Sequence, residues 1–407
     1  MTPMCMFNYK NISKVILFAG LVCSNIALAQ SPTDSIKTNQ NGIYNRPFID
    51  LGKTRTAVGG YLEGNTNYFA EDGVSEGFSM ELRRFNIFLY SQIHPKIKFL
   101  SELEFEHGTE EIALETALID VNLLPALNFR AGILLPNIGL VNTNHDSPNW
   151  EFVERPLSST QLIPSTLSEV GFGLYGRFYP NEKFMLTYDA YVVNGLQDNI
   201  VLNSEGRTFI PAGKNEQMFG EDNNGTPMIN LHTSIASRKF GEIGFGYYGG
   251  VYNSYMMEGE QIAPKRSLHL MALDYNINFN NLTLLGEFVW ASIDVPENTN
   301  EIYGGKQRGG FTELQIPLLK RKILSFESAT LKASIRYEYI DYNKGKFRTN
   351  ISSNIGDEIR GLAVGLGFRP ASGTIIRANY IFQNIHDALG NPPAKLGGFQ
   401  FGFATYF

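Results

Sequence analysis

The chain has 407 residues, of which 43% are apolar, 13% aromatic and only 18% charged, and its formal net charge is −6. The high aromatic content argues against a disordered chain, and the acidic balance provides no basic surface for nucleic acid. Beyond the N-terminal region, the chain has no apolar run of the roughly 18 residues or more that a membrane-spanning helix needs. These properties leave a secreted all-β protein or a β-barrel in a membrane.

Residues 1–29 have the pattern of a secretory signal peptide. Two lysines precede an apolar stretch, and residues 27–29 read Ala-Leu-Ala, which is a cleavage motif. Cleavage would remove both cysteines, Cys5 and Cys23, and would leave 32 basic residues (34 minus two lysines) against 40 acidic ones, a net charge of −8. The polar stretch 30–56 that follows is predicted to be a periplasmic N-terminal linker.

From residue 57 onward, apolar and polar residues alternate with a period of two, which indicates strands with one apolar face. The last nine residues show this best, because Phe occupies positions 399, 401, 403 and 407. Prolines fall between the alternating runs, as expected for a residue that cannot pair within a central strand. The pattern predicts sixteen strands, near residues 57–70, 78–93, 97–107, 112–122, 128–135, 170–179, 183–194, 228–238, 242–254, 267–278, 282–294, 307–317, 328–342, 357–369, 373–386 and 395–407.

The connections between these strands alternate between short and long, which is typical of an outer-membrane barrel. In a bilayer every backbone N–H and C=O group needs a partner, so the sheet must close on itself. An even number of strands places both termini on the side of the tight turns. We therefore predict an all-β fold: a transmembrane antiparallel β-barrel of about sixteen strands over residues 57–407, with short periplasmic turns and long extracellular loops. A soluble β-sandwich is the alternative, although it rarely needs so many strands.

One stretch of the chain resembles a known family. Residues 152–157 (Phe-Val-Glu-Arg-Pro-Leu), Ile163-Pro164 and the glycine-rich residues 170–176 resemble the phosphate-selective porin O and P family. The resemblance implies a sixteen-stranded, trimeric porin in the outer membrane of a Gram-negative bacterium. The final aromatic residue, Phe407, is similar to the signal that the barrel assembly machinery reads in such proteins. The acidic net charge leaves the transported ion open.

Because one face of each strand would contact lipid, the alternate polar residues are predicted to line the lumen. A sixteen-stranded barrel is wide enough to hold water, which would keep charges solvated. Charged walls would bias which ions pass, or cross-strand ion pairs would only stiffen the wall; both readings stay open. The predicted inward-facing residues are Glu63, Arg84, Glu102, Glu104, Glu106, Glu115, Arg130, Arg177, Lys183, Asp189, Glu287, Lys332, Arg336, Glu338 and Arg377.

The connection 136–169 is far longer than a hairpin needs, so it is predicted to be functional. We expect it to fold into the lumen and narrow the pore; the alternative is an exposed outer loop. The connection 195–227 is rich in Asn, Gly and charge and is expected to face outward. The polar residues that the constricting loop would contribute are His145, Asp146, Trp150, Glu151, Glu154 and Arg155.

The chain carries no catalytic, cofactor or metal motif. Its histidines lack metal-ligand spacing, and the nucleophile-elbow and P-loop patterns are missing. Ser267 and His269 give only a weak hint of a barrel lipase. The sequence predicts a cofactor-free, non-enzymatic porin for small hydrophilic solutes or ions, including anions such as phosphate. An enzymatic barrel is one alternative. A structural or adhesive barrel with a plugged lumen is another, and inward folding of residues 30–56 would favour it.

Overall fold

The computed structural model describes residues 37–50, 55–214, 216–297, 299–347 and 355–407. The predicted signal peptide lies outside these residues, as does the first part of the predicted linker. None of the helices in the described part of the chain is long and apolar enough to cross a membrane.

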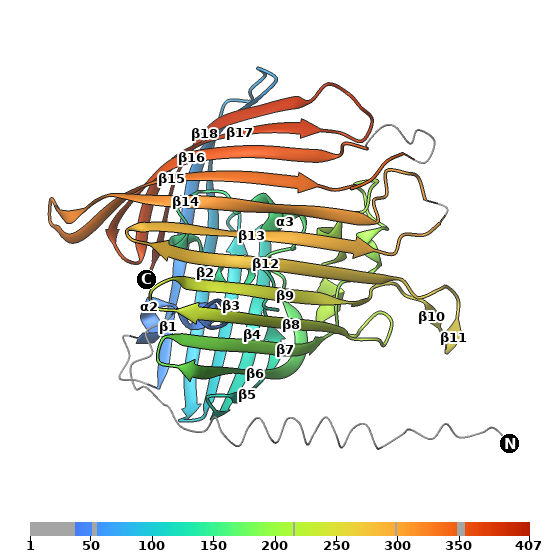
Figure 1. Cartoon of the computed structure of the whole chain (residues 1–407), viewed down its shortest axis with the longest axis horizontal. Coiled ribbons are helices and arrows are strands. Elements are labelled where there is room, and N and C mark those ends of the chain that lie inside the picture. The colour runs from blue at the N-terminus through green and yellow to red at the C-terminus, as the bar shows by residue number, and fades with distance from the viewer. Residues whose placement is uncertain (1–36, 51–54, 215, 298, 348–354) are drawn as a thin grey trace.

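The strands form one closed antiparallel barrel, so the predicted fold class is confirmed (Figure 1). Each strand pairs with its neighbours in sequence, and β1 pairs with β18 to close the barrel. The predicted strand ends agree within three residues, except that β14 continues beyond its predicted end. The sixteen strands are β1 (Thr56–Glu71), β2 (Phe78–His94), β3 (Ile97–Glu106), β4 (Glu111–Leu124), β5 (Leu127–Leu134), β6 (Glu169–Asn181), β7 (Phe184–Val193), β8 (Met228–Ser237), β9 (Gly241–Val251), β12 (Ser267–Phe279), β13 (Leu282–Ile293), β14 (Lys306–Ile323), β15 (Phe326–Asp341), β16 (Glu358–Ala371), β17 (Thr374–His386) and β18 (Ala394–Tyr406).

The alternation in the sequence becomes an inside and an outside of the barrel. In β8, Asn230 and His232 are buried, whereas Ile229, Leu231 and Ile235 between and beside them are each 46% exposed. A strand turns successive side chains to opposite faces, so the outer surface of the barrel is apolar and its inner surface largely polar. An apolar outer band is what a barrel in a lipid bilayer requires.

The two ends of the barrel differ. At the turn end, tight connections such as 125–126, 324–325 and 372–373 join neighbouring strands, and the C-terminus lies there (Figure 1). At the loop end lie the long connections, one of which carries the small hairpin of β10 (Met256–Met257) and β11 (Glu260–Gln261). The hairpin of β14 and β15 extends beyond its neighbours at the turn end, which explains the extra length of β14.

The helices are short and belong to segments outside the strands. Three short ones lie in the connection between β5 and β6, residues 135–168, which we call the lumen loop. Two more precede β1, in residues 37–50, which we call the N-terminal segment. The described helices are η1 (Asn39–Tyr44), α2 (Pro47–Asp50), η2 (Asn142–Asn144), η3 (Ser147–Asn149), α3 (Leu157–Gln161), η4 (Asp198–Ile200), η5 (Ile210–Gly213) and η6 (Glu216–Phe219).

Two segments differ from their predicted roles. The N-terminal segment is not a plain periplasmic linker, because Asn39, Gln40 and Arg46 are buried and contact residues far along the chain. The connection 194–227 does not simply face outward, since Ile200 and Met218 belong to the main apolar core. Both segments are rich in polar residues that reach hydrogen-bond partners inside the barrel, which polarity alone could not reveal.

The barrel interior has two unlike halves. Inward-facing apolar residues of β3 to β13, such as Leu100, Tyr191 and Leu270, pack with the lumen loop into one large cluster. Across the barrel, β14 to β18 with β1 and β2 contribute mainly charged and amide side chains, among them Arg336 and Arg377. The lumen loop therefore contacts an apolar cluster together with carboxylates such as Glu102 and Glu287 on one side, and mainly polar and charged side chains on the other.

Candidate functional site: the filled lumen

The lumen loop enters the barrel and bonds to inward-facing residues of several strands. The Leu140 amide and the Ser158 hydroxyl donate to the two oxygens of Glu287 on β13, at 2.8 and 2.7 Å. The Leu157 amide donates to Glu338 on β15 at 2.9 Å. These partners lie more than a hundred residues away in sequence, so the loop is held by tertiary contacts with the inner wall.

The N-terminal segment lies beside the lumen loop. Arg46 is 1% exposed and donates to both oxygens of Asp146 at 2.8 and 2.9 Å and to Glu102 on β3 at 2.8 Å. The Asn39 amide donates to Glu242 on β9 at 2.7 Å, and its side chain donates to Gly139 of the loop. Two separate chain segments therefore fill the barrel and are joined to each other.

A cationic wall faces the loop. We define it as Arg83, Arg84, Lys332, Arg336, Arg369 and Arg377, from strands β2 and β15 to β17. Several of these side chains bind backbone oxygens of the loop: Arg377 donates to the carbonyls of Ser147 and Trp150 at 3.2 and 3.0 Å, and Arg336 donates to that of Glu154 at 2.8 Å. Both arginines also form ion pairs within the barrel, Arg377 with Glu63 at 2.8 Å and Arg336 with Glu338 at 3.4 Å.

The wall also pairs with carboxylates of the loop and of its own strands. Lys332 and Arg369 both contact Glu151, at 3.1 and 3.0 Å. Arg83 binds Glu154 with two hydrogen bonds of 2.9 and 2.7 Å. Such charge-assisted pairs are stronger than neutral hydrogen bonds, and the two-fold arginine contact also fixes the orientation. The loop is therefore attached to the wall along residues 147–157.

Two cavities open at the turn end. The larger, of about 810 Å³, is lined by Lys320, Lys332 and Arg369 and by two carboxylates, Glu151 and Glu327. The smaller, of about 510 Å³, lies beside the N-terminal segment and is lined by Lys98 and Arg177, together with tyrosines and amides and without a carboxylate among its described lining residues. Both cavities carry a net positive charge.

A third space lies deeper, between the lumen loop and the cationic wall. It measures about 10 Å³, which is roughly the room that one water molecule needs. Trp150 lines it, and the next residue of the loop lines the larger cavity. Its charged lining consists of two carboxylates, Glu63 and Glu154, and of Arg84, Arg155, Arg377 and His145. We call it the central void.

The surroundings shift the pKa values of two residues of the lumen loop. Burial lowers the pKa of His145, but the carboxylates of Glu102, Asp146 and Glu115 raise it to about 9. Burial raises the pKa of Asp146, and the charge and hydrogen bonds of Arg46 bring it down to about 2. At neutral pH His145 is therefore cationic and Asp146 anionic. The central void then has four cationic and two anionic side chains around it.

Most of the predicted inward-facing residues lie on the inner side of the strands, where protein rather than open water surrounds them, and their role in lining a pore stays a prediction. The prediction is wrong for Lys183, which is exposed in the turn between β6 and β7. Arg84, Glu102, Glu104, Glu115, Arg130, Glu287, Arg336, Glu338 and Arg377 are all buried. Lys332 and Arg177 are half-buried and line the two cavities. Burying so many charges is tolerable because they pair with each other or with the loop. The water-filled lumen expected around them is not what the described residues form.

The six predicted residues of the loop gather against the wall. His145, Asp146, Trp150 and Glu151 are buried, and Glu154 and Arg155 are half-buried. Their role in narrowing a pore stays a prediction. His145 also lies close to Glu102 and Glu115, in the arrangement of groups that can hold a metal ion.

Four cationic residues of the described interior were not predicted from the sequence, for different reasons. Lys98 is an even number of residues from the inward-facing Glu102 on the same strand, and Arg369 is an even number of residues from the inward-facing Gly367. The alternation could therefore have placed both side chains inside the barrel. Arg83 could not be placed by parity, because a β-bulge between the Glu63–Arg84 and Gly64–Leu82 pairs turns it inward. Arg46 left no signal, since nothing in a polar segment before the first strand indicates a buried arginine.

The geometry of Ser267 and His269 does not support the alternative of a barrel lipase. Ser267 donates to Asp294, and Nδ1 of His269 lies 2.8 Å from the hydroxyl of Tyr247. Ser267 and His269 make no hydrogen bond with each other in the described structure.

Comparison with known sequences gives limited information. No protein-family profile matches the chain. A protein of Aquifex aeolicus (strain VF5), described as uncharacterized, is 32% identical over 192 residues, which is 43% of this chain and 42% of that protein. The similarity therefore spans less than half the length of this relative.

Comparison with solved structures identifies outer-membrane porins. An anion-selective porin from Comamonas acidovorans superimposes with a TM-score of 0.52 at 11% identity, covering 86% of this chain and 99% of that one. OprB of Pseudomonas putida superimposes with a TM-score of 0.51 at 9% identity, covering 86% of this chain and 94% of that one. OmpT of Vibrio cholerae, an outer membrane protein in a trimer form, superimposes with a TM-score of 0.51 at 11% identity, covering 87% of this chain and 100% of that one. The likeness shows a porin-like barrel fold and does not single out the phosphate-selective porin O and P family.

Proposed function

We propose that the protein is a narrow, non-enzymatic outer-membrane channel for small anionic solutes such as phosphate. In this proposal the solute moves along the cationic wall, from the loop end past the central void to the larger cavity at the turn end. The solved porins with the same fold support a channel, and the trimer form of one of them supports a homotrimer.

The observation that carries the proposal is the sign of the charge around each internal space. The chain as a whole is acidic, with a formal net charge of −6. Nevertheless cationic side chains outnumber carboxylates around both cavities and around the central void. Rings or walls of one charge bias which ions enter a pore. These three spaces therefore favour anions, although neither the total charge nor the set of buried residues as a whole does.

The chemistry of the wall also suits anions with several oxygens. Arginine presents a planar array of N–H donors that matches carboxylate and phosphate oxygens two at a time. Arg336 already donates to one backbone oxygen of the loop and Arg377 to two. A small displacement of the loop would free these donors for a passing anion. Because the contacts on this side are polar, water could replace them at modest cost.

Planar-bilayer recording of the folded protein tests the proposal. We expect conductance steps much smaller than those of an open sixteen-stranded porin, and a reversal potential in a salt gradient on the anion side. Replacing Lys332, which lines the larger cavity, by Gln should reduce anion preference by up to about fivefold, because one unit charge at about 4 Å in water is worth about 1 kcal/mol. Lys322→Gln on the same hairpin is the control, since its side chain is 59% exposed and does not line the cavity.

Two results would contradict the proposal. Cation selectivity of the wild-type protein would show that the cationic linings do not control permeation. Equal effects of Lys332→Gln and Lys322→Gln would show that the larger cavity is not on the pathway.

A closed structural barrel is the second candidate. The observation in its favour is the central void, which leaves room for about one water molecule, together with the inward folding of the N-terminal segment. The same recording separates the two candidates. A folded barrel that gives no conductance steps at any applied voltage would favour the closed barrel over the channel.

A further inference from the structure

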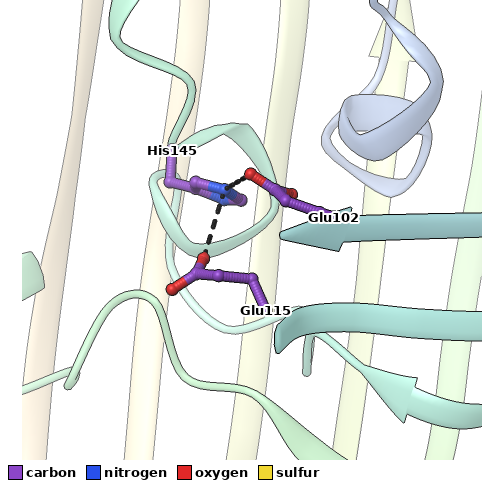
Figure 2. A group of neighbouring side chains, drawn as sticks. All are labelled: Glu102, Glu115 and His145. Atoms are coloured by element: carbon purple, nitrogen blue, oxygen red, sulfur yellow. Dashed lines mark hydrogen bonds and ion pairs between the residues drawn. The ribbon is translucent and has the colours of Figure 1, made fainter. Parts of the chain in front are cut away.

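Three side chains from three separate elements converge at one point inside the barrel. Figure 2 shows His145 of the lumen loop pointing between Glu102 of β3 and Glu115 of β4. Nε2 of His145 lies 3.2 Å from Oε1 of Glu102 and 3.5 Å from Oε2 of Glu115. All three residues are at most 4% exposed. The donor atoms are close enough to each other to contact a single ion.

The carboxylate of Glu115 is not satisfied by the protein alone. Its Oε2 atom is buried and has no hydrogen-bond partner, although it faces His145. A buried carboxylate oxygen without a partner costs free energy. This atom is therefore an independent indication that the site can accept a ligand.

The backbone of β4 is arranged so that Glu115 turns inward. Glu102 pairs with Thr116 while Leu103 pairs with Leu114, so Glu115 is the extra residue of a β-bulge. As a result Glu115 and Thr116 are consecutive and both buried, which a regular strand does not allow. Bulges often redirect a side chain toward a functional site.

The imidazole is oriented with one particular nitrogen toward the carboxylates. Nδ1 of His145 lies 3.1 Å from the backbone oxygen of Asn142, which can only accept, so Nδ1 carries a proton. Nε2 is then the atom that faces Glu102 and Glu115, with Oδ1 of Asp146 at 3.6 Å, and it would release its proton when a metal ion binds. A backbone carbonyl on the second nitrogen is the usual support of a metal-binding histidine.

We propose that His145, Glu102 and Glu115 form a binding site for a divalent transition-metal ion, with Zn²⁺ as the representative. Ligand atoms about 2.1 Å from a tetrahedral zinc ion are about 3.4 Å apart, and the distances of 3.2 and 3.5 Å fit this edge. An imidazole nitrogen among the ligands favours zinc-like ions over Mg²⁺ and Ca²⁺, which prefer oxygen alone. Oδ1 of Asp146 or a water molecule would take the fourth position.

Such an ion would connect the lumen loop to strands β3 and β4 of the barrel. His145 comes from the loop, whereas Glu102 and Glu115 belong to adjacent strands. Arg46 holds the second oxygen of Glu102, and Asn86 donates to the first at 2.7 Å, so this ligand is fixed in place. The ion would therefore clamp the loop in its inward position and would reduce any current that depends on displacement of the loop.

Zinc binding to the folded, chelator-treated protein in detergent tests the proposal. We expect elemental analysis after gel filtration to find one Zn²⁺ per chain. Calorimetry then measures the dissociation constant of the wild type and of each variant. Glu115→Gln removes the unpartnered carboxylate, and H145N removes the nitrogen ligand. Each should weaken binding by about tenfold or more, a loss already seen when only the supporting residues of metal sites are changed.

His232→Asn is the matched control. His232 is also buried between two carboxylates, but Asp274 faces Nε2 at 3.0 Å and Asp189 faces Nδ1 at 3.9 Å, on opposite sides of the ring. The two aspartates therefore cannot share one ion with a single nitrogen, and His232→Asn should bind zinc like the wild type. Retention of the heat-sensitive gel mobility of a folded barrel confirms folding of each variant.

Cobalt provides a second readout that does not depend on a variant. Co²⁺ added in place of Zn²⁺ should give the intense visible absorption of a four-coordinate site, and Zn²⁺ should displace it. The proposal is overturned if the wild type binds no Zn²⁺, or if Glu115→Gln and H145N bind it as well as His232→Asn does. Loss of zinc binding in His232→Asn alone would also overturn the proposal.

Discussion

Arg377 shows how single residues hold the lumen loop. Its guanidinium is 1% exposed and donates to two backbone oxygens of the loop, to the hydroxyl of Ser147 and to Glu63 on β1. Glu63 in turn pairs with Arg84, its direct neighbour across β1 and β2. One side chain therefore joins three parts of the interior, and its loss would leave several buried acceptors without donors.

Arg377→Gln should destabilise the barrel by about 3–5 kcal/mol, the usual cost of removing one partner of a buried ion pair. The free energy of unfolding, measured by denaturant titration in detergent or lipid, tests this. Arg360→Gln is the control, because Arg360 pairs with Glu358 at the surface with its side chain 55% exposed. Such a pair contributes less than about 1 kcal/mol. Equal losses in both variants would mean that Arg377 does not hold the interior together.

Glu154 predicts an acid-dependent attachment of the loop. Burial raises the pKa of Glu154, but the charge and hydrogen bonds of Arg83 lower it from 4.5 to about 2. A carboxyl whose pKa is lowered on folding stabilises the folded state above its ordinary pKa, and this contribution is lost as the pH falls through the lower value. The stabilisation from the Glu154–Arg83 contact should therefore be complete above about pH 4.5 and lost below about pH 2.

The comparison of wild type with Glu154→Gln isolates this contact. The wild type should have the higher free energy of unfolding above about pH 4.5. The difference should shrink as the pH decreases below about 4.5 and disappear below about pH 2, where Glu154 becomes fully protonated. A difference that stays constant over this range would show that the charge of Glu154 contributes nothing.

At the scale of elements, the strands and the segments between them obey different rules. Each strand is specified locally, because its outward residues must be apolar and its side chains alternate. The lumen loop and the N-terminal segment are placed by contacts with residues such as Glu242 and Glu287, which lie far along the chain. Their position could not be read from any pattern within the segments themselves.

A disulfide between the loop and β18 should lock the loop. A Cβ atom placed on Gly402 would lie 2.9 Å from Cγ2 of Val153, close to the about 3 Å between a Cβ atom and the partner sulfur in a disulfide. The double variant Val153→Cys/Gly402→Cys should therefore form this bond. The native cysteines, Cys5 and Cys23, precede the described residues and the predicted cleavage site.

Conductance before and after reduction measures the effect of the lock. We expect little current from the oxidised double variant and recovery to the wild-type level on addition of a reductant. The single variant Val153→Cys is the control and should not respond. Unchanged current in the oxidised protein would show that displacement of residue 153 is not needed for conduction.

Deletion of residues 37–46 should enlarge the conductance. The first strand begins at residue 56, so the deletion leaves every strand intact while it removes Arg46 and Asn39 from the interior. Deletion of residues 256–261, the exposed hairpin of β10 and β11 at the loop end, is the control and should leave conductance unchanged. Conductance that the first deletion does not change would mean that this segment does not obstruct the barrel.

At the scale of the whole molecule, the barrel depends on the closure between β1 and β18. The amide and carbonyl of Phe407 exchange hydrogen bonds with Gly60 at 3.0 and 3.2 Å. Its ring stacks on Phe85, with 5.7 Å between the ring centroids. A closed sheet has no unpaired edge, which a bilayer demands.

Phe407→Ala tests whether this residue also acts as the predicted assembly signal. The variant keeps the backbone hydrogen bonds and loses a ring contact worth about 0.5–1.5 kcal/mol. We expect the fraction of folded barrel in cells, measured by heat-dependent gel mobility, to fall well below the wild-type level. Phe399→Ala, on the same strand and 64% exposed, should assemble normally. Equal assembly of both variants would remove the special role of Phe407.

The barrel follows from the pattern of amino acids along the chain. The period-two alternation and the positions of proline predicted all sixteen strands, because a lipid-facing surface restricts every second residue of each strand. Only the tertiary structure decided what fills the lumen and which charge surrounds its cavities. Net charge counts residues wherever they lie, whereas His145, Glu102 and Arg377 act through neighbours that folding brings together from distant parts of the chain. Individual cavities of an acidic protein can therefore have a basic lining.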